Sequence, residues 1–322
     1  MGLVVRNLSK KYGDKVVVDN LNFEMPGPGV YALLGTNGAG KSTSIRMILG
    51  MLEKESGEAL WDGQPLNFDT CNIGYLAEER GLYPKYPLMD QIRYFGELRG
   101  VKGKDLDERI RYWAERLKVV EYLYPDEFED EREVKSDKKN ARAVKKKKKI
   151  PTADQLSKGN QQKIQFLIAM LSNPELIVLD EPFSGLDPVN TDILKEVVRE
   201  QIAAGKYIIM SSHQMEAVEE FCTDITIMNR SKAIVSGNLN EIKKSYGRVH
   251  LNLKTETDIR GILDEMGAEV LTEKDCEYKI KISGDEEGKQ ILQKLTESGV
   301  LVIRFELSEL SLHEIFVKEV GA

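Results

Sequence analysis

The chain has 322 residues, 41% hydrophobic and 31% charged, a composition typical of a globular protein with a substantial core. Its net charge of −7 argues against a dedicated nucleic-acid-binding protein, which usually carries a basic domain or stripe. No stretch approaches the roughly 18 uncharged apolar residues that span a bilayer, and the first residues lack the apolar core of a signal peptide. Three scattered cysteines favour a reducing cytosol over a disulfide framework or a metal cluster.

The first strong motif is a glycine-rich loop between an apolar strand and a helix. The run VYALLG predicts a buried strand, and SIRMILGML has the periodicity of a helix. Between them, GTNGAGKST at 35–43 satisfies the phosphate-loop pattern G-x-x-x-x-G-K-[ST]. Backbone N–H groups of such a loop converge on phosphate oxygens, and the helix that follows directs its positive end at the same anion. The predicted nucleotide-binding residues are Gly35, Asn37, Gly38, Ala39, Gly40, Lys41, Ser42 and Thr43.

Several residues of this loop have distinct predicted roles. Gly35, Gly38 and Gly40 permit backbone conformations that are closed to residues with a Cβ atom. Lys41 adds a positive charge for the β- and γ-phosphates, and the Ser42 hydroxyl is placed to bind Mg²⁺. The alternative is an ordinary glycine turn, which the flanking strand and helix disfavour.

The stretch from about 84 to 174 differs from the rest of the N-terminal part. It carries helical periodicity without a convincing strand, so we expect a helical subdomain inserted into an α/β domain that spans residues 1–246. Within it, residues 124–149 hold an acidic run followed by a basic run. Such blocks are usually solvated and mobile. The alternative is a docking arm for a partner subunit or for anionic lipid headgroups.

Two further apolar strands end in residues that suit hydrolysis. LIVLDE at 176–181 ends in two carboxylates, and strand alternation predicts different directions for them. Asp180 is predicted to hold Mg²⁺, and Glu181 to polarise an attacking water. KYIIMSSH ends at His213, at the sheet edge where ligands of α/β proteins bind, so this side chain is predicted to contact the γ-phosphate. A purely structural role is the alternative for His213.

The pattern changes after Gly247. Residues 247–322 read as strand, helix, two strands, helix, strand and a closing helix, which is the β-α-β-β-α-β order of a ferredoxin-like unit. This part carries no catalytic motif, and we expect a structural or regulatory appendage. The predicted fold class is therefore α/β, a P-loop NTPase with a mainly parallel sheet and a small α+β C-terminal domain.

Taken together, the motifs resemble those of ABC transporter ATP-binding subunits, most closely the bacterial exporters of ions, antibiotics and other drugs. LSKGNQQK at 156–163 resembles the ABC signature, and SGLDP at 184–188 resembles the loop after the catalytic Glu. Tyr12 matches the aromatic that stacks on adenine, and Glu78 stands at the usual Gln. The C-terminal SLHEIFVKEVG supports the exporter branch.

This resemblance implies ATP and Mg²⁺ as ligands and a dimer as the working unit. Two subunits close head to tail, and Ser157 and the Gly159 backbone of one would cover the γ-phosphate held by the other. Lys158 replaces a signature Gly and Asn160 the usual Gln. Glu78 can still meet Mg²⁺ and is counted with Glu181 and His213 as catalytic, although it adds negative charge beside a polyanion; a solvent-facing role is its alternative. For Tyr12 the alternative is a plain core aromatic.

The resemblance also implies partners and a location. We expect separate transmembrane permease subunits, a second ATP-binding subunit that makes a homodimer, no nucleic acid, and a peripheral position on the cytoplasmic face of the cell membrane. One alternative is a soluble ABC-type ATPase of translation or DNA maintenance, but the chain holds a single P-loop and no long coiled-coil heptads. A catalytically silent subunit is disfavoured because Glu181 and His213 are both present.

Overall fold

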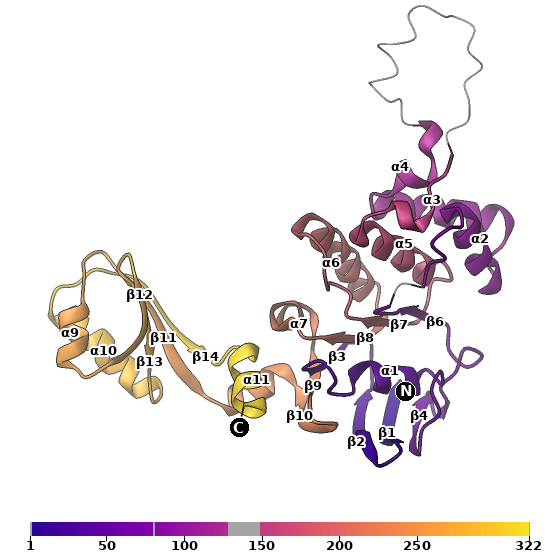
Figure 1. Cartoon of the computed structure of the whole chain (residues 1–322). Helices are drawn as coiled ribbons and strands as arrows, with labels where there is room; N and C mark the ends of the chain where they lie inside the picture. Colours follow the sequence, from indigo (N-terminus) through magenta and orange to yellow (C-terminus); the bar gives the residue numbers. More distant parts are fainter. Residues whose placement is uncertain (1, 80, 128–148, 322) are drawn as a thin grey trace, which may run out of the picture. The chain divides into compact units, whose positions relative to one another are not determined.

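A computed structural model of the chain describes residues 2–79, 81–127 and 149–321 (Figure 1). The chain divides into two compact units. The first comprises Met1–His213 and Met228–Ala233, and the second comprises Gln214–Ile227 and Ile234–Ala322. The predicted boundary between 246 and 247 remains a prediction. No helix among the described residues is long and apolar enough to cross a membrane.

The larger of the two sheets is mixed and has the strand order β5-β4-β1-β2-β10-β9-β3-β8-β7-β6. At one end of this order, β3, β8, β7 and β6 run parallel to one another. Their bounds are Gly29–Gly35, Tyr207–Ser212, Leu176–Asp180 and Ile73–Leu76. Every residue of β7 is buried, because strands covered on both faces take continuous apolar runs. The predicted parallel strands are thus confirmed.

At the other end of the order, four strands are antiparallel. They are β1 (Leu3–Tyr12), β2 (Lys15–Met25), β4 (Ser56–Trp61) and β5 (Gln64–Pro65). The sequence analysis did not anticipate this antiparallel lobe, although LNFEM at the end of β2 alternates apolar and polar residues in the way that marks a half-buried strand. The remaining strands of the sheet are β9 (Asp224–Asn229) and β10 (Lys232–Asn238).

Two helices adjoin the loops that follow the parallel strands. Helix α1 (Lys41–Ile48) begins within the glycine-rich motif, directly after Gly40, and its Ile45, Met47 and Ile48 belong to the hydrophobic core. Helix α6 (Pro188–Ala203) begins at Asp187, whose side chain accepts a hydrogen bond from the Asn190 N–H. Asp and Pro at these positions are strong signals for a helix start.

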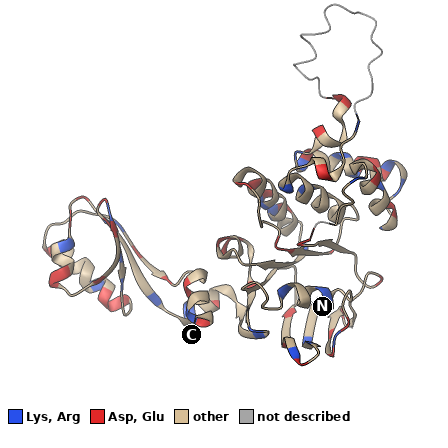
Figure 2. Cartoon of the chain, in the orientation of Figure 1, with Lys and Arg blue, Asp and Glu red and all other residues tan. Residues whose placement is uncertain are grey.

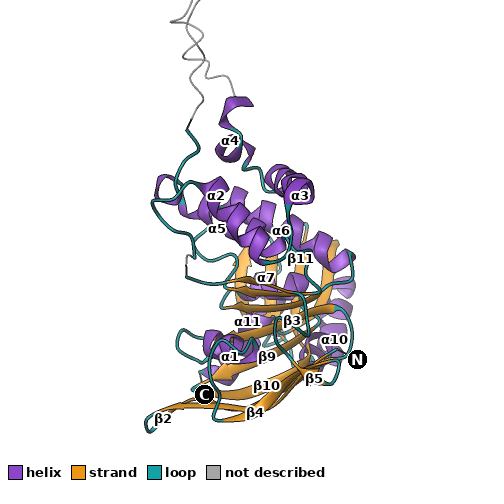
Figure 3. Ribbon diagram, turned by 90° about the vertical axis from the view of Figure 1, so that its right-hand side faces the viewer, coloured by secondary structure: helices purple, strands orange, loops and turns teal. Residues whose placement is uncertain are grey.

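The stretch predicted to be helical contains α2, α3, α4 and α5 (Figure 3). Their bounds are Leu88–Leu98, Gly103–Arg116, Val120–Leu123 and Lys158–Met170, with short 3-10 turns at Pro125–Glu127 and Ala153–Gln155. Between 84 and 174 the described residues form no strand, only one isolated bridge from Pro87 to Thr152. Most of the charged segment predicted at 124–149 lies outside the described residues, so its role remains a prediction.

The second unit contains a four-stranded antiparallel sheet with the order β12-β13-β11-β14. Its elements are β11 (Arg248–Thr255), α9 (Arg260–Glu265), β12 (Glu269–Lys274), β13 (Glu277–Lys281), α10 (Asp285–Glu297), β14 (Val302–Glu309) and α11 (Leu312–Val320). This confirms the predicted ferredoxin-like order. Acidic and basic residues are interspersed along α9 and α10 (Figure 2). The unit also holds α7 (Met215–Phe221) and α8 (Leu239–Ser245).

Candidate functional site

The glycine-rich loop follows the carboxyl end of β3 and bends tightly into α1. Gly38 and Gly40 have φ angles of 81° and 108°, in the region that favours glycine. A Cβ atom at Gly40 would also lie 2.5 Å from the carbonyl oxygen of Val17. Gly35 serves differently from the prediction: its φ is not positive, but a Cβ there would lie 2.6 Å from the Met228 carbonyl oxygen. Its role is therefore close backbone packing.

Seven of the eight predicted loop residues line a cavity of about 200 Å³. The lining residues are Val17, Asn37, Gly38, Ala39, Gly40, Lys41, Ser42, Thr43, Glu78 and Glu181. Gly35 lies just behind it, with its carbonyl oxygen accepting from Lys41. The cavity thus joins the loop to residues that follow β6 and β7, far away in the sequence.

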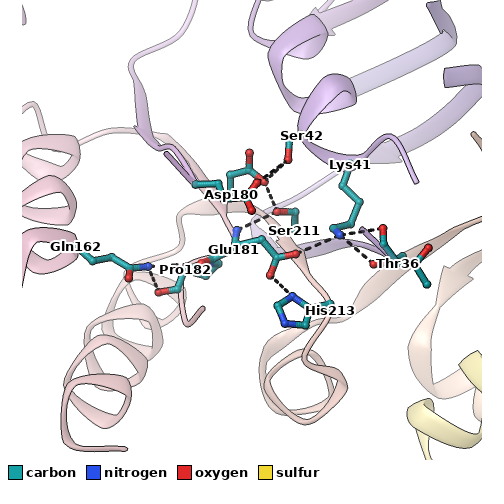
Figure 4. A network of polar contacts seen from close by, with 11 residues as sticks. Thr36, Lys41, Ser42, Gln162, Asp180, Glu181, Pro182, Ser211 and His213 are labelled. Atoms are coloured by element: carbon teal, nitrogen blue, oxygen red, sulfur yellow. Dashed lines mark hydrogen bonds and ion pairs between the residues drawn. The ribbon is translucent and has the colours of Figure 1, made fainter. Parts of the chain in front are cut away.

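Lys41 is only 6% exposed, and its ammonium contacts three groups. Its Nζ donates to the carbonyl oxygens of Gly35 at 2.9 Å and Thr36 at 3.5 Å, and it lies 3.2 Å from Glu181 Oε1 (Figure 4). A lysine ammonium that lines this cavity suits the binding of an anion.

Asp180 is fully buried at the end of β7. Its Oδ1 accepts hydrogen bonds from Ser42 Oγ at 3.1 Å and from Ser211 Oγ at 2.5 Å. Burial raises the pKa of this carboxyl, and the negative charges of Glu78 and Glu181 raise it further. The hydrogen bonds from Ser211 and Ser42 lower the pKa and offset part of this rise. Its Oδ2 is buried and has no hydrogen-bond partner among the described residues. A bound cation would satisfy both the orphaned oxygen and the excess negative charge.

The residues near Asp180 fit Mg²⁺, which prefers oxygen ligands and is usually held by one or two carboxylates together with substrate phosphates. Ser42 Oγ lies 3.4 Å from Glu78 Oε2 as well as 3.1 Å from Asp180 Oδ1, so the hydroxyl is close to both of the other predicted metal ligands. Glu78 is exposed and lines the cavity. Among the described residues no three His, Cys, Asp or Glu side chains form a preformed metal site, so a cation here would need further oxygens from a nucleotide.

Glu181 follows the last residue of β7 and has a φ of 52°, which is unusual for a residue with a long side chain. Its N–H donates to the Ser211 carbonyl oxygen at 3.2 Å and to Ser211 Oγ at 3.0 Å. Its Oε2 lies 2.7 Å from His213 Nδ1. The two carboxylates do point to different partners, but the cause is this left-handed backbone conformation and not strand alternation (Figure 4).

The signature segment lies at the start of α5, away from the cavity lining. Ser157 is exposed and caps the helix, accepting a hydrogen bond from the Asn160 N–H at 3.2 Å. Gly159 is buried, and a Cβ there would lie 2.8 Å from Asn190 Nδ2. Neither Ser157 nor Gly159 lines the cavity around the glycine-rich loop. Lys158 is exposed, and the Asn160 side chain donates to the Tyr122 hydroxyl at 2.9 Å.

Tyr12 ends β1 and is 53% exposed, so the core-aromatic alternative is excluded. It is not among the cavity-lining residues, whereas Val17 on the next strand is. Its ring lies 5.4 Å from Lys10 Nζ.

Two residues with polar contacts in this region escaped the sequence analysis. Ser211 Oγ donates to the Asp180 carboxylate and accepts from the Glu181 backbone N–H, and the Gln162 side chain of α5 donates to the Pro182 carbonyl oxygen at 2.5 Å. The sequence signal for Ser211 is its place two residues before His213 on a buried strand, where a hydroxyl needs a partner. For Gln162 no comparable signal exists, because its partner is a backbone carbonyl.

Comparisons with known proteins agree with this geometry. Residues 18–184 match the ABC transporter family, and residues 237–320 match the C-terminal domain of DrrA1-3-like ATP-binding proteins. The ABC transporter ATP-binding protein YhaQ of Bacillus subtilis is 39% identical over 99% of both chains. The linearmycin resistance ATP-binding protein LnrL of the same organism is 27% identical over 99% of this chain and 98% of its own length. A solved ATP-binding subunit of an ABC transporter, 27% identical, superimposes with a TM-score of 0.62 over 76% of this chain and 93% of its own.

Proposed function

Because the chain belongs to the ABC transporter family, as an ATP-binding and ATP-hydrolysing subunit of the DrrA-like exporter branch, we propose that two copies close head to tail around two ATP molecules. Closure on ATP and opening after hydrolysis would drive export through separate membrane subunits. Each nucleotide would lie between the glycine-rich loop of one copy and the signature segment of the other.

One observation carries this proposal: the cavity and the signature segment of one chain are separate. Ser157 and Gly159 do not line the cavity around Lys41, so a single copy offers no signature group to the phosphates. Ser157 is nevertheless exposed at the N-terminal end of a 13-residue helix, where N–H groups and the helix dipole favour an anion. A second copy can supply that end to the open side of the cavity.

Each group of residues in the site then has its own role in nucleotide binding or hydrolysis. The ammonium of Lys41 and the N–H groups of the glycine-rich loop hold the phosphates, and Tyr12 stacks on the adenine. Ser42, Asp180 and Glu78 would hold Mg²⁺, which neutralises charge on the phosphates. Glu181 orients and polarises the attacking water. His213, 2.7 Å from Glu181 through Nδ1, fixes that carboxylate and reaches the γ-phosphate.

The names of two relatives bear on the direction of transport. Relatives are named for linearmycin resistance and for Nod factor export. We infer export here as well, with permease subunits supplied by other chains, Mg²⁺ as the cation, and a position at the cytoplasmic face of the membrane. A homodimer is favoured because one chain carries both halves of the composite site.

The Glu181→Gln variant tests the dimer. With Mg²⁺ and ATP it should hydrolyse at least about 100-fold more slowly than the wild type, since a general base contributes typically 10²–10⁴-fold. Its mass by light scattering should double upon ATP addition and stay single with ADP. The Lys41→Ala/Glu181→Gln double variant is the control and should stay monomeric with either nucleotide.

Monomeric Glu181→Gln protein in ATP, both alone and in membranes that contain the permease, would refute the dimer. Wild-type turnover by Glu181→Gln would refute the assigned base. Purification from membranes, with identification of the chain that accompanies it, tests the permease partner.

A further inference from the structure

Ser211 is the hydroxyl that contacts the Asp180 carboxylate and the backbone N–H of Glu181, and nothing in the sequence motifs assigns it a role. It lies in β8 beside β7, with its Cα in register with that of Asp180. It is fully buried, so its polar atoms depend on protein partners. We propose that Ser211 is a positioning residue that fixes the orientations of Asp180 and Glu181 relative to each other; the inference rests on the hydrolytic roles proposed above for these two residues.

The hydrogen-bond partners of Ser211 determine the direction in which its hydroxyl proton points. Its Oγ accepts from the Glu181 N–H at 3.0 Å, and it lies 2.5 Å from Asp180 Oδ1, a carboxylate oxygen that can only accept. The hydroxyl therefore donates to Asp180 and accepts from Glu181 at the same time. No apolar side chain can do both.

The contact with Glu181 supports an unfavourable backbone conformation. At a φ of 52° a residue with a Cβ is strained, and such strain persists only where the surroundings hold it. The Glu181 N–H is shared between the carbonyl oxygen and the side chain of Ser211. This anchors the turn at which the side chain leaves the strand direction and reaches Lys41 and His213.

The contact with Asp180 leaves one of its two carboxylate oxygens without a hydrogen-bond partner. Oδ1 is engaged by Ser211 and Ser42, whereas Oδ2 has no hydrogen-bond partner among the described residues. Ser211 thereby holds the carboxylate so that one oxygen stays available to a cation. Removal of such supporting hydrogen bonds typically costs 10- to 100-fold in metal affinity or activity.

Two variants separate hydrogen bonding from packing. Ser211→Ala removes the hydroxyl, and Ser211→Cys keeps a group of similar size that bonds weakly. Both should lower kcat about 10- to 100-fold, while KM for ATP changes less than about threefold. Both should also raise the Mg²⁺ concentration required for half-maximal activity and for half of the rise in melting temperature that Mg²⁺ with ATP gives. Ser212→Ala is the matched control, because its side chain is equally buried on the same strand but points to the opposite side. It should keep kcat and the Mg²⁺ requirement near those of the wild type.

Three results would overturn the inference. The first is a kcat and Mg²⁺ requirement in Ser211→Ala within twofold of the wild type. The second is wild-type activity in Ser211→Cys with loss only in Ser211→Ala, which would assign a packing role. The third is a loss that follows the folded fraction measured by circular dichroism. If Glu181→Gln is inactive while both Ser211 variants are active, this inference alone fails; if Glu181→Gln is active, the proposed function fails.

Discussion

Lys41 Nζ lies 3.2 Å from Glu181 Oε1, and the two side chains are 6% and 5% exposed. The pair links the glycine-rich loop to the residue after β7, 140 positions later in the sequence. The other carboxylate oxygen of Glu181, Oε2, lies 2.7 Å from His213 Nδ1. A phosphate bound at the loop would compete with Glu181 for the Lys41 ammonium. Nucleotide binding would therefore release this carboxylate from one of its two partners.

We expect Lys41→Ala to destabilise the nucleotide-free protein, because it leaves a buried carboxylate with one partner fewer. The expected loss is about 1–3 kcal/mol, and Glu181→Gln in the same chain should recover part of it, since a neutral amide tolerates burial better. Urea unfolding of the four proteins of this double-mutant cycle measures the coupling.

The same Lys41→Ala protein should lose the rise in melting temperature that ATP gives the wild type. Strictly additive unfolding energies for the two substitutions would show that the ion pair is not energetically coupled. Equal melting of the wild type with and without ATP would contradict nucleotide binding at the loop.

Two glycines of the loop should respond unequally to alanine. Gly40→Ala meets a positive φ and a Val17 carbonyl oxygen 2.5 Å from the new Cβ, whereas Gly38→Ala meets a positive φ only, with no atom of the described residues within 4 Å. We expect Gly38→Ala to cost about 1 kcal/mol and Gly40→Ala at least 2 kcal/mol, with the larger loss of ATP affinity. Thermal melting with and without ATP makes the comparison. Equal losses would show that the close approach to Val17 is unimportant.

Tyr12→Ala should weaken ATP binding with little effect on folding. The residue is 53% exposed, so removal of its ring should change stability by less than about 0.5 kcal/mol, whereas loss of stacking should raise Kd for ATP roughly 5- to 10-fold. Tyr112→Ala, on a helix of the same unit and 52% exposed, is the matched control and should leave Kd unchanged. Isothermal titration measures both. An unaltered Kd in Tyr12→Ala would remove the residue from the nucleotide site.

The second unit should have an acid-sensitive contribution to its stability from Glu314 on α11. Burial raises the pKa of this carboxyl, but the Lys279 ammonium, the Ser311 N–H and hydroxyl, and the His250 charge lower it more, to about 2 from an ordinary value of 4.5. Because the folded pKa is depressed, the stabilisation is fully present above about pH 4.5 and is lost as the pH falls toward 2.

Glu314→Gln removes this pH-dependent part. After allowance for solvent screening, the variant should be less stable by about 1–2 kcal/mol at pH 7, and the difference should shrink below pH 4. Urea unfolding at pH 7, 5, 4 and 3 measures the trend. A stability difference that stays constant from pH 7 to pH 3 would show that Glu314 does not make the pH-dependent contribution.

Local sequence patterns were sufficient to predict those features of this protein that a single continuous segment forms. The glycine-rich loop, the strand that ends in Asp180 and Glu181, and the βαββαβ order after Gly247 each lie within a short window, where periodicity and turn chemistry act. The antiparallel strands β1, β2, β4 and β5 were missed, because only one stretch of β2 alternates clearly and their pairing joins residues up to about 60 positions apart.

Only the tertiary structure decided how these features meet. It placed Ser211 between the Asp180 carboxylate and the Glu181 backbone N–H, gave Glu181 its left-handed turn, and joined Lys41 to Glu181. It also separated the signature at Ser157 from the cavity in the same chain. Sequence motifs specify which groups a chain carries, because residue type fixes charge and hydrogen-bonding capacity. Sheet order and strand register determine which of those groups come within bonding distance, and both depend on contacts between segments remote in the sequence.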